Sequence, residues 1–242
     1  MRASGYLLAA VFGLACSGAG SAQDLNDEFD DAKTLKGWTV FKPGNAEPYQ
    51  KLDIGTARKG WLTLTPKANQ GWYNEGTAPA LFKQIEGDFM LETCVVTRKA
   101  GAPDEAPAAA YNSAGLIVRD PASGPRRQNW VVVNVGHQDP DLGTEVKTTV
   151  NSVSQLEKRR GEHTGHLRLA RIGTTVYALS KLNGEDKWTL LKEPERRDLP
   201  QRVQIGLMCN GWTPQSDLHA EFDYFRVTVP KTKDDLTADA KK

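Results

Sequence analysis

The sequence predicts an all-β protein built as an antiparallel sandwich or barrel. Short runs of alternating apolar and polar residues recur along the chain, and they are rich in Val, Thr and aromatic residues. Turn residues separate these runs at the spacing typical of sandwiches and barrels. The sequence lacks long stretches with the 3.6-residue apolar period of a helix, and it lacks internal repeats that would indicate a propeller or a solenoid.

Residues 1–22 precede the predicted fold as a cleaved signal peptide. They combine a basic Arg2, an apolar run and small residues before the expected cleavage point. The apolar run is shorter than the roughly 20 residues that span a bilayer. The mature chain should therefore begin near Gln23 and be secreted or periplasmic. A lipoprotein signal lipidated at Cys16 is the alternative, but the residues before it fit that pattern poorly.

The strand-forming runs follow in order from residue 37. Residues 79–97 contain two strands around a Glu-Gly-Asp turn, and residues 165–191 contain strands around an Asn-Gly hairpin turn. The other runs are 37–41, 49–54, 60–66, 113–120, 129–136, 144–150, 202–210 and 218–229. Together they predict a single domain over residues 23–230, which is long enough for one core without disulfides.

Several segments are predicted to lie outside the strands. Residues 98–112 combine Gly, Ala and Pro and should form a long loop at one end of the domain. The basic runs 157–160 and 195–197 have acidic residues nearby and should be solvated loops. Residues 231–242 are charged and nearly free of large apolar side chains, so they are predicted to be a disordered tail.

Charge and cysteine content narrow the possible partners and cross-links. After loss of Arg2, basic and acidic residues are equal in number, which argues against nucleic-acid binding. No second apolar run is long enough to span a membrane. Cys94 and Cys209 remain, and an exported protein can join such a pair. Strand parity places Cys209 on the apolar face of its strand but Cys94 on the opposite face, which disfavours a disulfide.

Several phrases in a fixed order resemble secreted bacterial proteins of the concanavalin A-like lectin/glucanase superfamily, in a subgroup of largely unknown function. The phrases are DEFDD, GWYNEGTAPALFKQIEGDFMLET, SAGLIVRDP, NWVVVNVG, EVKTTVNS, VQIGLMC and AEFDYFRV. The resemblance covers residues 25–229 and is more specific for fold than for activity. It implies a jelly-roll sandwich of two curved sheets, with carbohydrate as the commonest ligand on the concave face.

Acidic residues near both ends of the domain suggest two further roles. The resemblance implies that glucanases of this group often carry three carboxylates along one strand, but AEFDYF has only Glu221 and Asp223. Asp27 and Asp30 lie near the expected first strand, beside the expected last one. With Asp223 they would supply oxygen ligands for a structural calcium ion. The alternative is that these acids form the exposed side of half-buried strands, and no other cofactor is expected.

Aromatic residues in loops are the clearest candidates for ligand contact. Sugar rings present flat C–H faces that stack on exposed aromatic rings. Trp72 and Tyr73 lie among turn residues beside an Asn and a Glu, and Trp212 also lies in a loop. Each of these rings is alternatively a clamp on the edge of the sandwich. The other Trp residues of the early strands and of the hairpin, Trp38, Trp61 and Trp188, should serve packing.

Strand parity gathers a polar face on one sheet. Alternate Val residues of 129–136 and 144–150 should face the inter-sheet core. The opposite face then collects polar and aromatic side chains: Glu92, Arg119, Trp130, Asn134, Glu145 and Lys147. Such a face suits a saccharide groove, and it also suits an ordinary ladder of cross-strand ion pairs.

Three hypotheses for function remain at this point. The first is a carbohydrate-binding sandwich in which Trp130, Trp72 and Tyr73 stack on the sugar while the polar face binds its hydroxyls. The second is a glycoside hydrolase that uses Glu92 and Glu145 as its two carboxylates. Because a neighbouring Arg or Lys keeps both carboxylates ionised, binding is favoured over hydrolysis. The third is a structural or adhesion module without a small ligand. The sequence leaves the sugar and the oligomeric state open.

Overall fold

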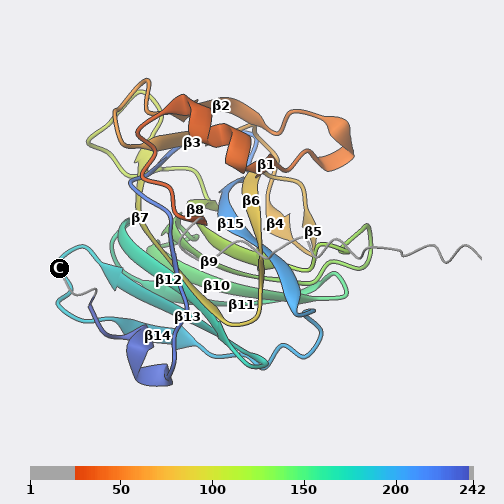
Figure 1. Cartoon of the computed structure of the whole chain (residues 1–242). Helices are drawn as coiled ribbons and strands as arrows, with labels where there is room; N and C mark the ends of the chain where they lie inside the picture. The colour runs from red at the N-terminus through yellow and green to blue at the C-terminus, as the bar shows by residue number, and fades with distance from the viewer. Residues whose placement is uncertain (1–24, 240–242) are drawn as a thin grey trace, which may run out of the picture.

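The computed structural model describes residues 25–239, and the expected signal peptide lies outside them. Two antiparallel sheets form a sandwich, which confirms the predicted fold class (Figure 1). The seven-stranded sheet has the order β1 (Thr39–Val40), β6 (Ala80–Glu86), β15 (Arg202–Gly211), β8 (Asn112–Arg119), β9 (Trp130–His137), β10 (Leu142–Val150) and β11 (Val153–Arg160). Within the described residues, no helix has the length and apolar content needed to cross a membrane.

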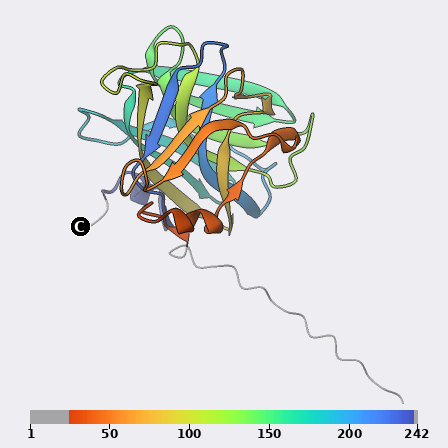
Figure 2. The same cartoon turned by 90° about the horizontal axis from the view of Figure 1, so that it is seen from above.

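The eight-stranded sheet forms the other layer of the sandwich. Its order is β14 (Thr189–Lys192), β13 (Thr175–Leu182), β12 (Thr164–Ile172), β7 (Phe89–Lys99), β16 (Leu218–Phe222), β3 (Leu62–Pro66) and β2 (Tyr49–Ile54), with β17 (Arg226–Thr228) also paired to β7. Strands β2 and β3 lie at the top of Figure 1 and nearest the viewer in Figure 2. The remaining elements are the hairpin strands β4 (Trp72–Tyr73) and β5 (Glu75–Gly76) and the short 3-10 helices η2 (Ala32–Gly37), η3 (Pro43–Asn45) and η4 (Lys233–Leu236).

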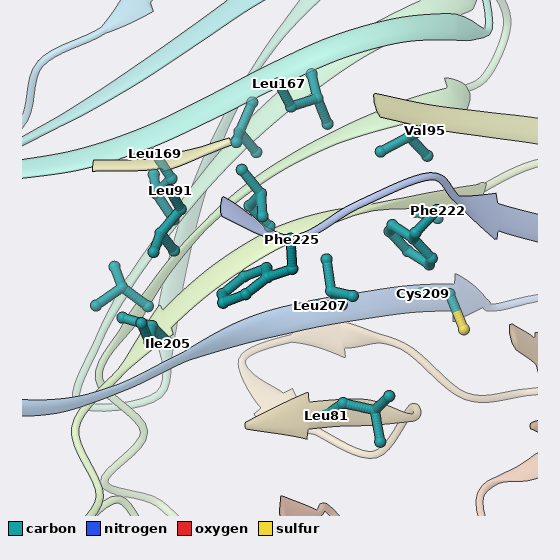
Figure 3. Close-up of a cluster of buried hydrophobic side chains, with 14 of the residues drawn as sticks. Leu81, Leu91, Val95, Leu167, Leu169, Ile205, Leu207, Cys209, Phe222 and Phe225 are labelled. Atoms are coloured by element: carbon teal, nitrogen blue, oxygen red, sulfur yellow. The ribbon is translucent and has the colours of Figure 1, made fainter. Parts of the chain in front are cut away.

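The core lies between the two sheets and follows the parity predicted from the sequence. Val131, Val133 and Val135 of β9 and Val146 of β10 are all buried in it. Figure 3 shows side chains from both sheets meeting in this layer, with the sulfur of Cys209 among them. Cys94 lies outside this cluster and both cysteines are free, so the parity argument against a disulfide is confirmed.

One predicted loop is a strand. Residues 157–160 belong to β11, which pairs with β10 from Val150 to Gly143 and forms an edge of the seven-stranded sheet. The prediction of a solvated loop is wrong for these residues. Because β11 is exposed along most of its length, its residues are mostly polar and lack the alternation of apolar and polar residues that indicates a strand. The exposed edge explains why charged residues are accepted in this strand.

The C-terminal tail is the second difference. Residues 231–239 are described, and the prediction of disorder is wrong for them. Helix η4 buries Leu236 against Ala170 and Leu179 on the outer face of the eight-stranded sheet. The buried Arg168 donates hydrogen bonds to the carbonyl oxygens of Leu236 and Ala238, at 2.8 and 2.9 Å. One buried apolar residue, two backbone acceptors and the ion pairs of Lys233 with Glu193 and of Asp239 with Lys181 therefore attach a tail whose composition is mostly polar.

Deleting residues 231–242 should lower the free energy of unfolding by about 2–3 kcal/mol, because the burial of Leu236 alone contributes about 1.5–3 kcal/mol. The deletion also removes two acceptors from the buried Arg168 guanidinium. Urea denaturation measures the change, with Leu236→Ala expected to reproduce part of it. An exposed tail variant, Lys231→Ala, serves as the control. A deletion without effect on the unfolding midpoint would show that the tail does not stabilise the sandwich.

Candidate functional site

A pocket of about 260 Å³ lies on the outer face of the seven-stranded sheet, away from the inter-sheet core. The alternation of side chains along β10 explains its position. Val146 points into the core, so its neighbours Glu145 and Lys147 point to the opposite face of the sheet. The lining comes from β4, β8, β10, β11 and β15 and from the segments beside them. The lining residues are Trp72, Tyr73, Tyr111, Ser113, Gln138, Glu145, Lys147, Leu156, Asn210 and Trp212.

The hairpin β4–β5 lies across this face and is attached at both ends. At the β15 side, the backbone of Gln70 pairs with Gly211, and the Trp72 amide donates to Asn210 Oδ1 at 2.8 Å. At the β11 side, the side-chain oxygen of Asn74 accepts a hydrogen bond from the backbone amide of Ser154, and the backbone amide of Asn74 donates one to Ser154 Oγ. The hairpin thus passes over β8, β9 and β10, which lie between β15 and β11 in the sheet.

Local sequence explains the tight turn. Asn74 has a φ of 56°, a left-handed conformation that Asn accepts more readily than most residues. The carboxylate of Glu75 makes a further attachment, since its Oε1 accepts hydrogen bonds from Ser152 Oγ at 2.7 Å and from the backbone amide of Arg126 at 2.9 Å. Gly76 is required because a Cβ there would lie 2.4 Å from the Trp72 ring.

Trp72 is the buried anchor of the hairpin. Its ring lies 5.1 Å from Phe41 and meets Phe82 and Trp130 edge to face, at centroid distances of 6.3 and 6.0 Å. These rings form a second apolar cluster, together with Ile117, outside the main core. Edge-to-face contacts of this kind are the favourable arrangement of aromatic pairs. The cluster holds the hairpin down on the sheet and makes one wall of the pocket.

The floor of the pocket carries a buried ion pair. Lys147 Nζ lies 2.8 Å from Glu145 Oε1, with side-chain exposures of 7% and 2%. Glu145 Oε2 has no hydrogen-bond partner among residues 25–239. Asn134, directly opposite Glu145 in the sheet, accepts from Gln138 through Oδ1, while its Nδ2 also lacks a partner in the described chain. Glu145 lines the pocket, so its unpaired carboxylate oxygen lies at the floor, whereas Asn134 lies beside Glu145 in the sheet and is not among the lining residues.

Exposed aromatic rings form the rim. Tyr73 and Trp212 are 43% and 44% exposed, and their ring centroids lie 6.5 Å apart at an interplanar angle of 67°. Lys147 Nζ lies 5.8 Å from the Tyr73 ring centre, which links the rim to the floor. Large aromatic rings left in contact with solvent beside a polar floor are the surroundings that a ligand with apolar and polar faces requires.

Two predicted contact residues lie elsewhere on this face. Trp130 is completely buried beneath Trp72, so the prediction that it stacks on a ligand is wrong. Parity placed it on the correct face, but the hairpin covers it. Arg119 donates to Gln204 Oε1 and to the Ser123 carbonyl oxygen, both at 2.7 Å, and does not line the pocket. Burial lowers the pKa of its guanidinium.

Glu92 belongs to the other sheet, so the prediction that it shares a face with Glu145 is wrong. Its strand β7 pairs with β12, and Glu92 accepts from Arg168 and from Tyr224 Oη at 2.6 and 2.7 Å. His166 Nδ1 lies 2.9 Å from the same Tyr224 hydroxyl. Burial raises the pKa of Tyr224 and lowers that of His166. The carboxylate pair of the hydrolase hypothesis is therefore not assembled.

The acids considered for calcium have other contacts. Asp27 accepts hydrogen bonds from Trp38 Nε1 at 2.8 Å and from the Phe29 amide at 2.9 Å. Burial raises the pKa of Asp223, which lies in the segment after β16. Among residues 25–239, no group of three or more His, Cys, Asp or Glu side chains is arranged to hold a metal ion. Asp30 is exposed, and the structure does not bring it together with the other two as a ligand set.

Sequence reasoning missed half of the pocket. Ser113 and Asn210 are cross-strand neighbours on β8 and β15, and the Asn210 amide donates to Ser113 Oγ at 3.0 Å. Their alternation with buried Ala114 and Cys209 was a usable signal. Leu156 lies in β11, where the sequence predicts no strand. Tyr111 and Gln138 lie outside strands, where no periodicity indicates orientation.

No protein-family model and no curated protein sequence match this chain. Solved structures do match it in fold. A functionally unknown protein from Saccharomyces cerevisiae aligns with a TM-score of 0.62 and 15% identity, over 82% of this chain and 99% of that protein. The acidic lectin of winged bean, complexed with methyl-α-D-galactose, aligns with a TM-score of 0.54 and 12% identity, over 84% and 96%. The fold is concanavalin A-like.

A xylan β-1,4-xylosidase from Bacillus halodurans also contains this concanavalin A-like fold. It aligns with a TM-score of 0.63 and 15% identity over 84% of the present chain. The chain spans only 38% of the length of that enzyme. Identities this low establish the shared architecture, and they leave the pocket residues of this chain to be interpreted from their own geometry.

Proposed function

We propose that the protein is a lectin-like carbohydrate-binding module whose ligand occupies the pocket on the seven-stranded sheet. The buried Glu145–Lys147 pair below the exposed rings of Tyr73 and Trp212 is the observation that carries this proposal. Sugars combine hydroxyls, which need carboxylate, ammonium or amide partners, with C–H faces, which stack on aromatic rings. The pocket offers both within one small volume. Through its expected signal peptide the protein would act in the periplasm or outside the cell.

Binding is favoured over hydrolysis by the composition of the pocket. Most glycoside hydrolases use two carboxyl groups flanking the scissile bond. Glu145 is the one carboxylate among the residues that line this pocket, and its Oε1 is already paired with Lys147. The neighbours in fold support a sugar ligand in general terms, since a lectin with a bound galactoside and a xylosidase are among them. An adhesion module without a small ligand is the outcome if no glycan binds.

A panel of plant and algal polysaccharides, followed by calorimetry on the glycan that binds, tests the proposal. Tyr73→Ala and Trp212→Ala should each weaken binding at least tenfold, about 1.4 kcal/mol, because each removes an exposed stacking surface. Trp61→Ala is the matched control, since Trp61 is a partly exposed Trp at the start of the β3 region of the other sheet. Absence of binding across the panel, or equal losses in all three variants, would contradict the proposed site.

A further inference from the structure

We infer that the pocket recognises the end of a sugar chain, as a terminal residue or disaccharide, and does not accept an internal stretch of polysaccharide. This inference rests on the proposed function and specifies the class of ligand. Internal segments of a polymer need a groove that is open at both ends. The arrangement of the hairpin, the volume of the pocket and the chemistry of its floor each favour a closed site.

The hairpin closes the sheet face on one side of the pocket. It is fixed to β15 through Asn210 and to β11 through Ser154, so it crosses the full width of the strands between them. Below it, Trp72 packs on Ile117 and Trp130 and fills the space between hairpin and sheet. A sugar chain lying along the strands of this face would therefore meet the hairpin and could not pass beneath it.

Side chains from other segments limit the remaining sides. Tyr111 comes from the end of the long loop before β8, and Gln138 comes from the turn after β9. Gln138 is buried, and its amide donates to Asn134 Oδ1 at 2.7 Å, which fixes it beside the floor. Leu156 on β11 and Trp212 beyond β15 lie at opposite edges of the pocket. The lining thus comes from both sides and both ends of this part of the sheet.

The volume agrees with a short ligand. Pockets that bury a drug-sized molecule measure about 300–1,000 Å³. The present pocket, at about 260 Å³, is slightly smaller than that range. A monosaccharide or a disaccharide fits such a space, whereas a longer oligosaccharide would have to extend into solvent past the exposed rings of Tyr73 and Trp212.

The floor distinguishes a terminal sugar from an internal one by its hydroxyls. A terminal residue has a free hydroxyl at the position where an internal residue carries a glycosidic oxygen, which has no proton to donate. Glu145 Oε2 is a buried acceptor without a partner in the described chain, so a hydroxyl of a terminal sugar would supply the donor that it lacks. Leaving such an acceptor unsatisfied in the complex costs about 1–3 kcal/mol. Sites built to bond a hydroxyl reject analogues that lack it for this reason.

Digestion of a bound polysaccharide by an endo-acting glycosidase tests the inference, because it multiplies chain ends at constant sugar mass. The probe is the polymer that binds in the panel, and the readout is the number of binding sites per gram by calorimetry. End recognition predicts that this number rises in proportion to the reducing ends measured on the same sample. A number that stays constant or falls overturns the inference and leaves the proposed function intact. Failure of every glycan to bind, before and after digestion, overturns both.

A hairpin variant tests the structural cause. The triple variant Trp72→Ala, Asn74→Ala and Glu75→Ala removes the buried anchor of the hairpin and the side-chain hydrogen bonds of its turn to Ser154 and Ser152. With the wall released, the intact polymer should gain binding sites and the difference between intact and digested polymer should shrink at least severalfold. Glu157→Ala, an exposed change on the same strand β11 outside the pocket, should leave the difference unchanged. An unchanged difference in the hairpin variant would show that the hairpin does not block the polymer.

Discussion

Replacing Lys147 with Met should lower the free energy of unfolding by about 3–5 kcal/mol, the range found when one partner of a buried ion pair is removed. The substitution leaves Glu145 buried as an uncompensated charge. Its Oε1 loses the ammonium at 2.8 Å, and its Oε2 already lacks a partner in the described chain. Because Met has nearly the shape of the Lys stem, lost packing contributes little, and the effect measures the charge. Urea denaturation followed by intrinsic fluorescence gives the value.

The double substitution Glu145→Gln with Lys147→Met should recover most of this loss. Buried ion pairs contribute little beyond what well-packed neutral residues of similar volume supply, since both charges must first be desolvated. The cycle of wild type, two single variants and double variant isolates the coupling between the two side chains. If Lys147→Met changes stability by less than about 0.5 kcal/mol, water reaches the ion pair, and the floor is less desolvated than its burial indicates.

The same double variant separates folding from binding. It should be nearly as stable as the wild type, yet it removes the carboxylate and the ammonium from the floor. Loss of glycan binding in a folded double variant would assign the pair to the ligand. Retained binding with unchanged affinity would instead assign it to structure alone, as in the ion-pair ladder that the sequence left open as an alternative.

Strand parity predicted from sequence which residues of a strand share a face, and this determines how much of the site was foreseeable. Asn134, Glu145 and Lys147 do share the outer face of one sheet, since β9 and β10 pair directly. Parity does not reveal which sheet a strand joins. Glu92 alternates correctly along β7, but β7 lies in the other sheet, so Glu92 and Glu145 are on opposite sides of the inter-sheet core. Which sheet a strand joins depends on pairing with strands that are far away in the sequence.

The second limit on prediction from the sequence is that it does not show which segments cover a face of a sheet. Nothing in the sequence around Trp130 indicates that a hairpin from residues 72–76 lies over it, because the contacts that attach that hairpin join residues far apart in the chain. The tail shows the same limit, since one buried Leu236 in a polar segment gives no periodic signal. Edge strand β11 has a polar sequence because it lies at the margin of the sheet. Local patterns thus predicted the layers, while tertiary contacts shaped the pocket.

Replacing Trp72 with Ala should cost about 3–5 kcal/mol of unfolding free energy, as large-to-small changes of buried aromatic residues do. Trp72 is fully buried and contacts the rings of Phe41, Phe82 and Trp130, so its removal leaves a cavity between hairpin and sheet. The hydrogen bonds of the hairpin to Ser152 and Ser154 are made at its exposed turn, so they do not compensate for the packing lost in that cavity. Chemical denaturation measures the loss.

Trp72→Phe is the matched variant, because it retains a ring against Trp130 and should cost less than half as much. Quenching by acrylamide then distinguishes a local opening from general loosening. In Trp72→Ala, the newly uncovered Trp130 should become accessible to the quencher, whereas in Trp72→Phe it should stay protected. If Trp130 remained protected in both variants, the sheet face would be covered by something other than Trp72. The hairpin would then owe its position to its polar attachments, and the wall of the pocket would not depend on this aromatic cluster.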